Sequence, residues 1–394
     1  MQYEQPPLLP EPDSASAAHS ERVANFIRMQ IEAAGGSISF GEYMQHVLYA
    51  PGLGYYAAGA AKFGEAGDFI TAPEVSTAFG GVVARQCAEV LAQIPAGEVL
   101  EYGAGSGKLA VDVLEALRRL DSLPTAYKIV EVSGDLRERQ EALLQQRVPE
   151  LLPRVSWLDA PPTKMQGVIL ANEVLDAIPV ERFVRRDGAI QQQRVAVAGR
   201  EFAWVDAPAP ARLRAAVEAI EAELGAPFPE AYVSEVSLAV PAWIQGLADT
   251  LQAGIAFLFD YGVSRREYYV LERSSGWLRC HFRHHAHNDP LVLAGIQDVT
   301  AWVDFTAVAE AAVAAGFEIS GYCAQAQFLM AGGLAEELKN LATLPLQEQL
   351  ALSRQVKTLT LPGEMGEHFK CMALQKGVIA TPSAFALADR THTL

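Results

Sequence analysis

The sequence predicts an α/β protein with a largely parallel β-sheet covered by helices. Between Val99 and Ala171, short apolar runs typical of strands alternate with stretches whose apolar residues recur at helical spacing. This alternation is typical of parallel sheets with helical crossovers. A glycine-rich turn, residues 103–107, separates the first strand from the first helix. The 394-residue chain is long enough to bury such a core without disulfide or metal support.

The N-terminal part is predicted to be helical, with an aromatic segment. Residues 1–20 contain four prolines and no apolar run, and we expect them to form a flexible tail. Apolar residues recur at helical spacing over 21–34, and a Gly-Gly pair ends that pattern. The aromatic stretch 40–73 is predicted to be irregular, either packed in the core or acting as a lid. With a second helix over 76–94, this gives an N-terminal helical and lid region, residues 21–95.

An α/β core is predicted over residues 96–180, followed by an insertion over 181–232. The core comprises strands at 99–101, 127–132, 155–158 and 168–171 and helices at 109–120 and 136–147. In the insertion, Asp187-Gly188 and Gly199-Arg200 separate alternating strands between 182 and 205, which predicts an antiparallel β-meander. A helix over 211–224 completes the insertion.

The remainder, residues 233–394, is predicted to complete the sheet and to supply loops of the active site. Its expected elements are helices at 236–252 and 305–315 and strands at 255–259, 317–322, 326–330 and 369–374.

Charge and composition exclude several classes of protein. The chain has 31 Lys and Arg against 47 Asp and Glu, a net charge of −16, which argues against a nucleic-acid partner. Its four cysteines are far apart and form no CxxC pair, so we expect neither a disulfide framework nor a zinc site. No segment resembles a secretory signal or a membrane span. We therefore expect a cytoplasmic protein without a membrane partner, and the sequence leaves a homodimer open.

Four histidines cluster between His281 and His287. Their spacing does not match HExxH, and few acidic or cysteine partners lie nearby in the sequence. Because Arg279 and Arg283 lie among them, a basic loop at the mouth of the active site is predicted. No bound metal is expected.

The glycine-rich turn allows three interpretations. A phosphate-binding P-loop requires GxxxxGK followed by Ser or Thr, but Tyr102 stands five residues before Gly107 and Leu109 follows Lys108. A dinucleotide fingerprint requires GxGxxG, whereas this turn has the pattern GxGxG. The third interpretation fits best. The string Glu101-Tyr-Gly-Ala-Gly-Ser-Gly resembles motif I of class I S-adenosylmethionine methyltransferases, in which glycines let the backbone approach the cofactor.

Two further acidic positions strengthen this interpretation. Glu131 lies near the end of the second predicted strand, where a carboxylate can accept hydrogen bonds from the two ribose hydroxyls. Asn172 and Glu173 directly follow the apolar run 168–171, and ligands of open α/β sheets bind beyond the carboxyl ends of strands. The alternative for this pair is a helix N-terminus, with Asn172 as the cap and Asp176 in the first turn.

Several ordered strings resemble the MidA family of class I methyltransferases. They are the string GDFITAPEVS at 67–76, ANEVLDAIPV at 171–180, DYG at 260–262 and GIQDVTAWVDF at 295–305. The resemblance covers about residues 20–375, and mitochondrial members of the family are regarded as protein arginine methyltransferases that assist assembly of respiratory complex I. Trp302 departs from the family, which often has His in that place, so a role of that His does not carry over to this position.

The resemblance implies a seven-strand Rossmann-like core that binds S-adenosyl-L-methionine, and a role for individual residues. Gly67, Asp68, Phe69, Thr71 and Glu74 would form one wall of the cofactor pocket. Gly103, Gly105 and Gly107 would cradle the methionine part, with Glu101 supporting the end of the strand and Glu131 holding the ribose. Asn172 and Glu173 would face the reacting methyl group.

The resemblance also implies a protein substrate, with arginine as the first candidate. A guanidinium stays protonated and is a poor nucleophile, so carboxylates that grip it would orient one nitrogen and hold the charge on the others. The candidate carboxylates are Glu173, Asp176 and Glu235, with Asp260 in reserve. Two other functions remain open at this point, a methyltransferase acting on a small molecule and an assembly factor that binds the cofactor without catalysis.

Overall fold

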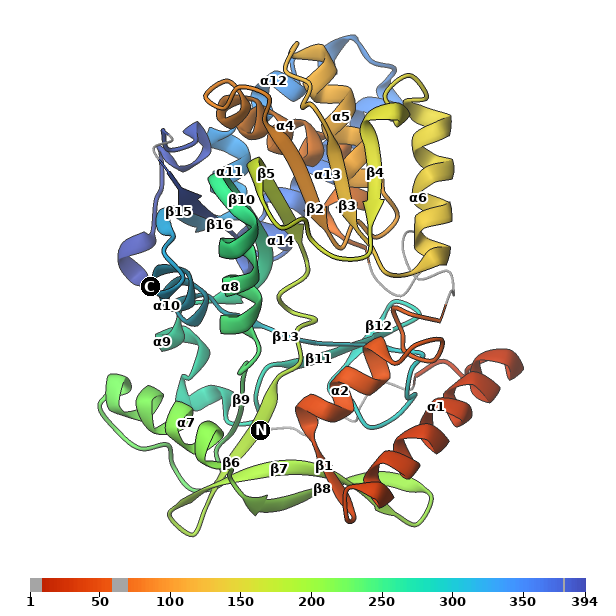
Figure 1. Ribbon diagram of the computed structural model, residues 1–394, viewed down its shortest axis with the longest axis vertical. Helices are drawn as coiled ribbons and strands as arrows, with labels where there is room; N and C mark the ends of the chain where they lie inside the picture. Colours follow the sequence, from red (N-terminus) through yellow and green to blue (C-terminus); the bar gives the residue numbers. More distant parts are fainter. Residues whose placement is uncertain (1–8, 59–69, 378–379) are drawn as a thin grey trace. The chain divides into compact units, whose positions relative to one another are not determined.

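Two units make up the fold, one with a single large sheet and the other with two smaller sheets. The computed structural model describes residues 9–58, 70–377 and 380–394. Within these ranges, unit 1 comprises residues 9–58, 176–240 and 265–302, and unit 2 comprises residues 70–175, 241–264 and the described residues from 303 onward. Each unit is therefore built from separate stretches of chain, which can be followed by colour in Figure 1.

Unit 2 contains the predicted parallel sheet. Its strands are β2 (Glu98–Tyr102), β3 (Tyr127–Val130), β4 (Val155–Leu158), β5 (Met165–Asn172), β10 (Leu251–Val263), β15 (Glu318–Ala324) and β16 (Phe369–Lys376), with the short β14 (Val303–Asp304) beside β10. The spatial order is β15-β16-β10-β5-β2-β3-β4. The five strands from β10 to β4 are parallel to one another, and β16 runs antiparallel to both of its neighbours. This confirms the seven-strand α/β core.

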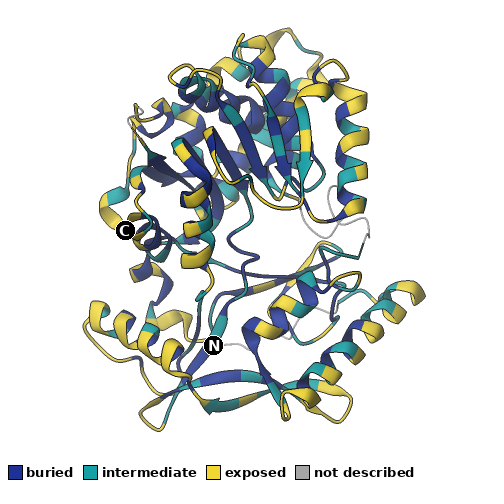
Figure 2. Ribbon diagram, viewed as in Figure 1, coloured by how far each residue is buried: buried dark blue, intermediate teal, exposed yellow. Residues whose placement is uncertain are grey.

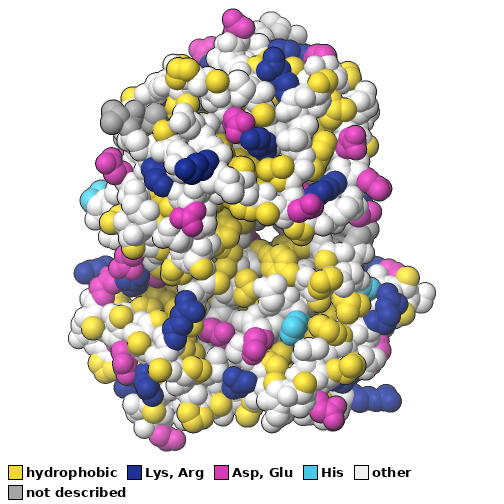
Figure 3. All heavy atoms as spheres, viewed as in Figure 1, with side chains coloured by type: hydrophobic (Ala, Val, Ile, Leu, Met, Phe, Trp, Pro, Cys, Tyr) yellow, Lys and Arg dark blue, Asp and Glu magenta, His cyan; other side chains and the backbone are white. Residues whose placement is uncertain are grey.

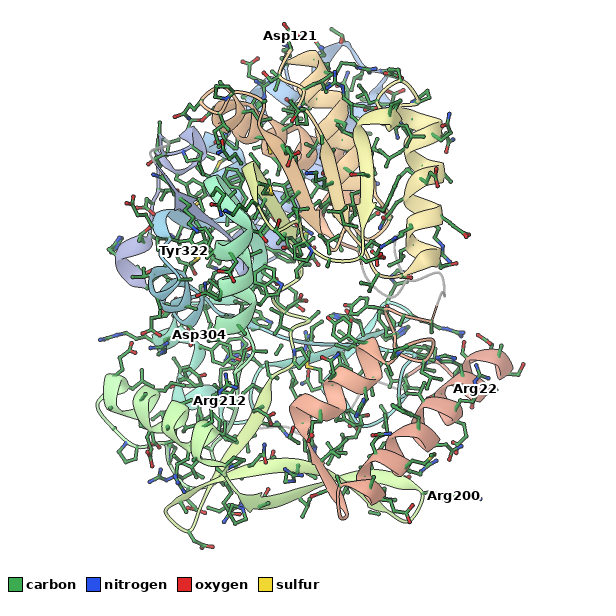
Figure 4. All side chains as sticks on the ribbon, viewed as in Figure 1. Arg22, Asp121, Arg200, Arg212, Asp304 and Tyr322 are labelled. Carbon is green, nitrogen blue, oxygen red and sulfur yellow. The ribbon has the colours of Figure 1, made fainter. Side chains whose placement is uncertain are left out.

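Helices cover this sheet and enclose the core of unit 2. They are α3 (Ala72–Val75), α4 (Thr77–Leu91), α5 (Lys108–Arg119), α6 (Gly134–Arg147), α8 (Val240–Thr250), α10 (Phe305–Ala314), α11 (Gln325–Ala331), α12 (Leu334–Glu337), α13 (Leu346–Thr360) and α14 (Met365–His368). The central strands β5 and β10 are buried along continuous apolar runs, 168–171 and 255–259, as expected of strands covered on both faces (Figure 2). Asp304, labelled in Figure 4, caps α10, because its Oδ1 accepts from the N–H groups of Thr306 and Ala307.

Unit 1 contains two smaller sheets. The first has β1 (Ser37–Ser39), β6 (Glu181–Arg186), β7 (Ala189–Ala198), β8 (Glu201–Pro208) and β9 (Val233–Val236), and the second has β11 (Leu278–Phe282), β12 (His285–His287) and β13 (Asp298–Ala301). The strands β6, β7 and β8 pair antiparallel in succession, which confirms the predicted meander. Arg200, labelled in Figure 4, lies at the turn between β7 and β8. The helices of this unit are α1 (Ser14–Ala33), α2 (Phe40–Tyr49), α7 (Ala211–Leu224) and α9 (Arg265–Tyr268).

Three predicted elements differ from the structure. The first helix begins at Ser14 rather than 21, because the side chain of Asp13 accepts from two N–H groups of its first turn. The segment predicted as irregular from residue 40 begins with α2, because Ser39 and Glu42 form a capping box. Residues 326–330 are not a strand but part of α11. Its buried residues Gln325, Phe328 and Leu329 have the i, i+3, i+4 spacing of a helix face.

Charged side chains do not divide the visible surface into acidic and basic halves. On the face in Figure 3, Lys and Arg side chains are interspersed with Asp and Glu side chains. Among the described residues, no helix is both long and apolar enough to span a bilayer.

Candidate active site

The glycine-rich turn joins β2 to α5 in unit 2 and has a left-handed backbone at each of its three glycines. The φ angles are +63° at Gly103, +54° at Gly105 and +85° at Gly107, and Gly107 is the N-cap of α5. Close neighbours add a second constraint. A Cβ at Gly103 would lie 3.0 Å from Cγ2 of Val174, and one at Gly107 would lie 3.2 Å from Cα of Gln140. The positive φ favours glycine at all three positions, and the space at Gly103 and Gly107 is tight for any larger residue.

Glu101 is buried at the end of β2, directly before the turn. Its side-chain Oε2 accepts a 2.6 Å hydrogen bond from the hydroxyl of Tyr127 on β3. Burial raises the pKa of Glu101 to about 7, although the hydrogen bond from Tyr127 acts in the opposite direction. The residue is only 2% exposed, so this carboxyl supports the end of the strand from below the surface.

Glu131 follows β3 and belongs to a hydrogen-bonded network centred on Gln140 of α6. Its Oε1 accepts from the N–H of Ser133 at 2.9 Å, and its Oε2 accepts from Nε2 of Gln140 at 3.3 Å. Nε2 of Gln140 also donates to the carbonyl oxygen of Gly105 at 2.9 Å. Oε1 of Gln140 accepts from the indole N–H of Trp157 at 2.8 Å. Burial raises the pKa of Glu131, with the hydrogen bonds from Ser133 and Gln140 opposing it. Gln140 thus connects the predicted ribose acid to the glycine-rich turn.

Gln140 was not among the residues predicted from the sequence, although the sequence contains a signal for it. The buried residues of α6 are Leu136, Gln140 and Leu144, spaced four residues apart along one helix face. An amide in the middle of an otherwise apolar stripe is unusual, because a buried polar group needs hydrogen-bond partners. Gln140 is fully buried, and its partners are the ones described above.

The wall predicted from the N-terminal region is described in part. Thr71 is the N-cap residue of α3, and Glu74 lies in that short helix. The carboxylate of Glu74 accepts a hydrogen bond from the hydroxyl of Ser106, inside the glycine-rich turn. This contact brings Glu74 to the turn, and its place in the wall of a cofactor pocket stays a prediction. The other predicted wall residues, Gly67, Asp68 and Phe69, lie outside the described residues.

Asn172 and Glu173 lie at the carboxyl end of β5, close to the glycine-rich turn. Nδ2 of Asn172 donates to Oε1 of Glu173 at 3.1 Å, and the same oxygen accepts from the N–H of Ala72 at 3.4 Å. Glu173 has a φ of +53°, a left-handed conformation that is strained for a residue with a Cβ. Within the described part of the chain, Oδ1 of Asn172 is buried without a hydrogen-bond partner. A buried acceptor of this kind is what a bound ligand would satisfy.

The other two predicted catalytic acids belong to unit 1. Asp176 is the residue at which the chain re-enters unit 1, three positions after Glu173. It is buried, and its carbonyl oxygen accepts a hydrogen bond from the N–H of Ala301. Glu235 on β9 is fully buried, with Oε1 3.2 Å from Nε of Arg182 and Oε2 accepting from the N–H of Trp277 at 2.7 Å. Burial raises the pKa of Glu235, and Arg182 opposes that shift. These contacts favour a structural role for Glu235 within unit 1, whereas Glu173 is held beside the turn.

The aromatic side chains described in unit 1 are held by contacts within that unit. The hydroxyls of Tyr43, Tyr49 and Tyr56 donate to Pro290 O, Ala177 O and Asp298 Oδ1, at 2.9, 2.9 and 2.8 Å. The described aromatic residues therefore contribute to the core, the first of the two roles predicted for this stretch. Trp302 stacks on Trp277 with ring centroids 4.4 Å apart, so it is a packing residue here.

Histidines 281–287 lie on the β11–β12 hairpin. Burial is the main cause that lowers the pKa of His281 to about 4, and the nearby Arg279 adds to the effect. Among the residues that the structure describes, no group of three or more His, Cys, Asp or Glu side chains is arranged to hold a metal ion.

A groove of about 620 Å³ lies within unit 1. Arg28, Arg182, Phe202 and Trp204 are among its lining residues. Both guanidinium groups are already paired within unit 1, Arg28 with Glu21 at 2.9 Å and Arg182 with Glu235. The groove contains none of the predicted site residues, so we place the candidate active site in unit 2.

The residues of unit 2 fit the cofactor implied by the sequence. Three left-handed glycines give the turn the sharp backbone bend that a cofactor-binding turn between a strand and a helix needs. The carboxylate of Glu131 at the end of β3 suits a pair of hydroxyls, and the buried Oδ1 of Asn172 needs a donor. Glu74, Glu131, Asn172 and the three glycines would hold the ligand, while the buried Glu101 and Gln140 would support the strand end and the turn from beneath.

Comparisons with known proteins agree with the cofactor that these residues fit. A family model described as "Putative S-adenosyl-L-methionine-dependent methyltransferase" matches residues 82–323. The protein arginine methyltransferase NDUFAF7 homolog, mitochondrial, of Drosophila melanogaster is 30% identical over 408 residues, covering 96% of this chain and 90% of that protein. The mitochondrial protein arginine methyltransferase NDUFAF7 of Mus musculus is 31% identical over 375 residues, covering 86% and 81%. A Burkholderia thailandensis protein crystallised with S-adenosyl-homocysteine is 41% identical, with a TM-score of 0.93 and coverage of 98% and 100%.

Proposed function

Because this chain belongs to the MidA family of S-adenosyl-L-methionine-dependent methyltransferases, we propose that it transfers the methyl group to an arginine side chain of a protein. The relatives from Drosophila melanogaster and Mus musculus are named protein arginine methyltransferases, which supports this acceptor. When bound, S-adenosylmethionine supplies a methyl group that is already activated on a sulfonium sulfur. The protein's own task is then to position the two reactants, which accounts for about 7–11 kcal/mol in well-oriented reactions.

The single observation that carries the proposal is the placement of Glu173. Its carboxylate is fixed by Asn172 and the N–H of Ala72 at the end of β5, beside the turn that would hold the cofactor. A guanidinium has a pKa above about 12 and keeps its charge at neutral pH, so an adjacent carboxylate is its natural partner. A carboxylate held in this way would orient one nitrogen toward the methyl group while keeping the positive charge on the other nitrogens.

The test is Glu173→Gln, measured in two separate assays. We expect calorimetry to show S-adenosyl-homocysteine affinity within about threefold of the native protein, because the amide keeps the shape of the carboxylate. Transfer of radiolabelled methyl from the cofactor to protein in a cell lysate should fall by a factor of at least roughly 100, as expected when a positioning contact is lost. Glu318→Gln, an exposed acid at the start of β15, is the matched control and should retain full transfer.

The location of the label decides between this function and the two alternatives. Label in a protein band, recovered as methylarginine after acid hydrolysis, supports the proposal. Label in the small-molecule fraction of the native reaction would indicate a small-molecule acceptor instead. Tight cofactor binding by the native protein without any transfer would indicate an assembly factor. Parallel loss of binding and transfer in Glu173→Gln would assign Glu173 to the cofactor rather than to the acceptor.

A further inference from the structure

The carboxyl end of β10 holds the backbone that follows Asn172. The N–H of Glu173 donates to the carbonyl oxygen of Phe259 at 2.8 Å. The next two N–H groups, of Val174 and Leu175, both donate to Oδ2 of Asp260, at 3.2 and 2.9 Å. Three consecutive N–H groups of this loop are therefore fixed by two consecutive residues of the neighbouring strand.

Asp260 is built into the sheet rather than exposed at its edge. The residue is 1% exposed, and its Oδ1 accepts from its neighbour's N–H, that of Tyr261, at 2.9 Å. A carboxylate that accepts several backbone N–H groups forms charge-assisted hydrogen bonds, which are stronger than neutral ones. Both carboxylate oxygens of Asp260 therefore accept hydrogen bonds from backbone N–H groups.

The loop held by Asp260 needs such an anchor. Glu173 has a φ of +53°, and only glycine adopts the left-handed region without cost. A strained backbone conformation persists where the surrounding contacts stabilise it by more free energy than the strain costs. The hydrogen bonds from Val174 and Leu175 set the direction of the chain immediately after Glu173. Val174 is also restrained on its other side, because its Cγ2 lies where Gly103 leaves room.

We propose that Asp260 is a positioning residue, which acts through the N–H groups of Val174 and Leu175 to hold Glu173 in its left-handed conformation. The inference rests on the proposed function for the role of the Glu173 carboxylate. Asp260 itself need not touch either reactant. Its function is to keep the carboxylate of Glu173 aligned, and misplacement by about 1 Å can cost a factor of 100 in rate.

A double-mutant cycle tests this coupling without any acceptor. Asp260→Asn keeps the volume but removes the charge and leaves one acceptor oxygen for the N–H groups of Val174, Leu175 and Tyr261, so the anchor is weakened. Glu173→Gly removes the strain that the anchor opposes. We expect Asp260→Asn to lower the melting temperature in the native background and to lower it by less than half as much in the Glu173→Gly background. Glu173→Gly alone should not lower the melting temperature.

The kinetic part of the test compares Asp260→Asn with Glu337→Gln. Glu337 is a comparable acid of unit 2, which pairs with Arg85 and Arg119 and has no described contact with this loop. Asp260→Asn should lower kcat by a factor of about 10–100 with the cofactor KM within threefold, whereas Glu337→Gln should lower stability and leave kcat unchanged.

Equal melting-temperature losses in the two backgrounds, or an unchanged kcat for Asp260→Asn, would overturn the inference. If Asp260→Asn fails to fold but the double variant folds, the coupling is supported, and if neither folds the inference is wrong. A native protein that does not methylate arginine would count against the proposed function alone, because the cycle needs no acceptor.

Discussion

Gly103 leaves room for the side chain of Val174, a residue 71 positions further along the chain. A Cβ atom at Gly103 would lie 3.0 Å from Cγ2 of Val174, and the φ of Gly103 is +63°. The glycine-rich turn and the segment that carries Glu173 are therefore packed against each other within unit 2. A substitution in the glycine-rich turn should therefore also shift the segment that carries Glu173.

Gly103→Ala should weaken cofactor binding. A left-handed alanine costs on the order of 1–2 kcal/mol, which corresponds to roughly a tenfold loss of S-adenosyl-homocysteine affinity if the turn relaxes in the free protein. Calorimetry would measure the loss. Gly188→Ala is the matched control, because Gly188 has a φ of +71° in the β6–β7 turn and nothing within 4 Å of its Cβ position. It should lose stability but no affinity, and equal affinity for both variants would contradict the assignment.

Gln140→Leu should separate the predicted ribose acid from the turn. The leucine removes hydrogen bonds to Gly105, Glu131 and Trp157, and leaving such buried groups unpaired costs about 1–3 kcal/mol. We expect S-adenosyl-homocysteine affinity to fall about tenfold or more. Gln86→Leu removes another buried amide, which bonds to Ala384 and Gly332, and should lower only the melting temperature. Unchanged affinity in Gln140→Leu would show that this network is not part of the cofactor site.

Glu101→Gln should change how stability depends on pH. The pKa of Glu101 is about 7 in the folded protein and 4.5 in its ordinary range, so between these values the folded state binds more protons than the unfolded state. The unfolding free energy of the native protein should therefore fall as pH rises from about 4.5 to about 7, and this contribution should then level off. The total is at most roughly 3 kcal/mol.

Urea unfolding at pH 5 and pH 8 would measure that effect. Glutamine keeps an acceptor for Tyr127 but does not titrate, so the difference between the two pH values should shrink in the variant. An identical pH dependence in both proteins would mean that Glu101 ionises near its ordinary value.

Arg182→Met should destabilise the protein through Glu235. Removing one member of a buried ion pair leaves an uncompensated charge, and such changes typically cost about 3–5 kcal/mol. Since Arg182 is partly exposed, we expect a loss near the lower end of that range, measured by urea unfolding. The double variant Arg182→Met, Glu235→Gln should recover part of the loss, because the buried charge is removed.

The same pair tests the role of Glu235 in methyl transfer. If its contacts are structural, Glu235→Gln should lose stability and retain kcat at a temperature where it is folded. A large loss of kcat without a loss of stability would instead support the catalytic role predicted from the sequence.

The sequence predicted the parts of the fold that depend on local patterns. The apolar runs at 168–171 and 255–259 identify central parallel strands, and the glycine spacing identifies the turn, because both signals are contained in a few neighbouring residues. The α2 helix was missed although its capping box, Ser39 and Glu42, is local. The glycine and aromatic residues around it are typical of irregular structure, and the prediction followed them rather than the capping box.

Contacts between distant segments could not be predicted in the same way. The hydrogen bonds from Val174 and Leu175 to Asp260 join residues about 85 positions apart, and no local pattern indicates which carboxylate faces which N–H. The ion pair of Glu235 with Arg182 joins two strands of unit 1 and likewise depends on register. The catalytic assignments of Asp176 and Glu173, the cytoplasmic location and a homodimer remain predictions.

The order in which the chain contributes to the two units has a consequence for biosynthesis. Unit 1 needs residues 9–58, 176–240 and 265–302, so its first helices leave the ribosome long before their last partners do. At roughly 5–20 residues per second, that interval is on the order of tens of seconds. During this time, apolar residues of α1 and α2, such as Ile27 and Phe40, have no complete core to enter. The nascent N-terminal segment should therefore be a client for chaperones that shield apolar surfaces during translation.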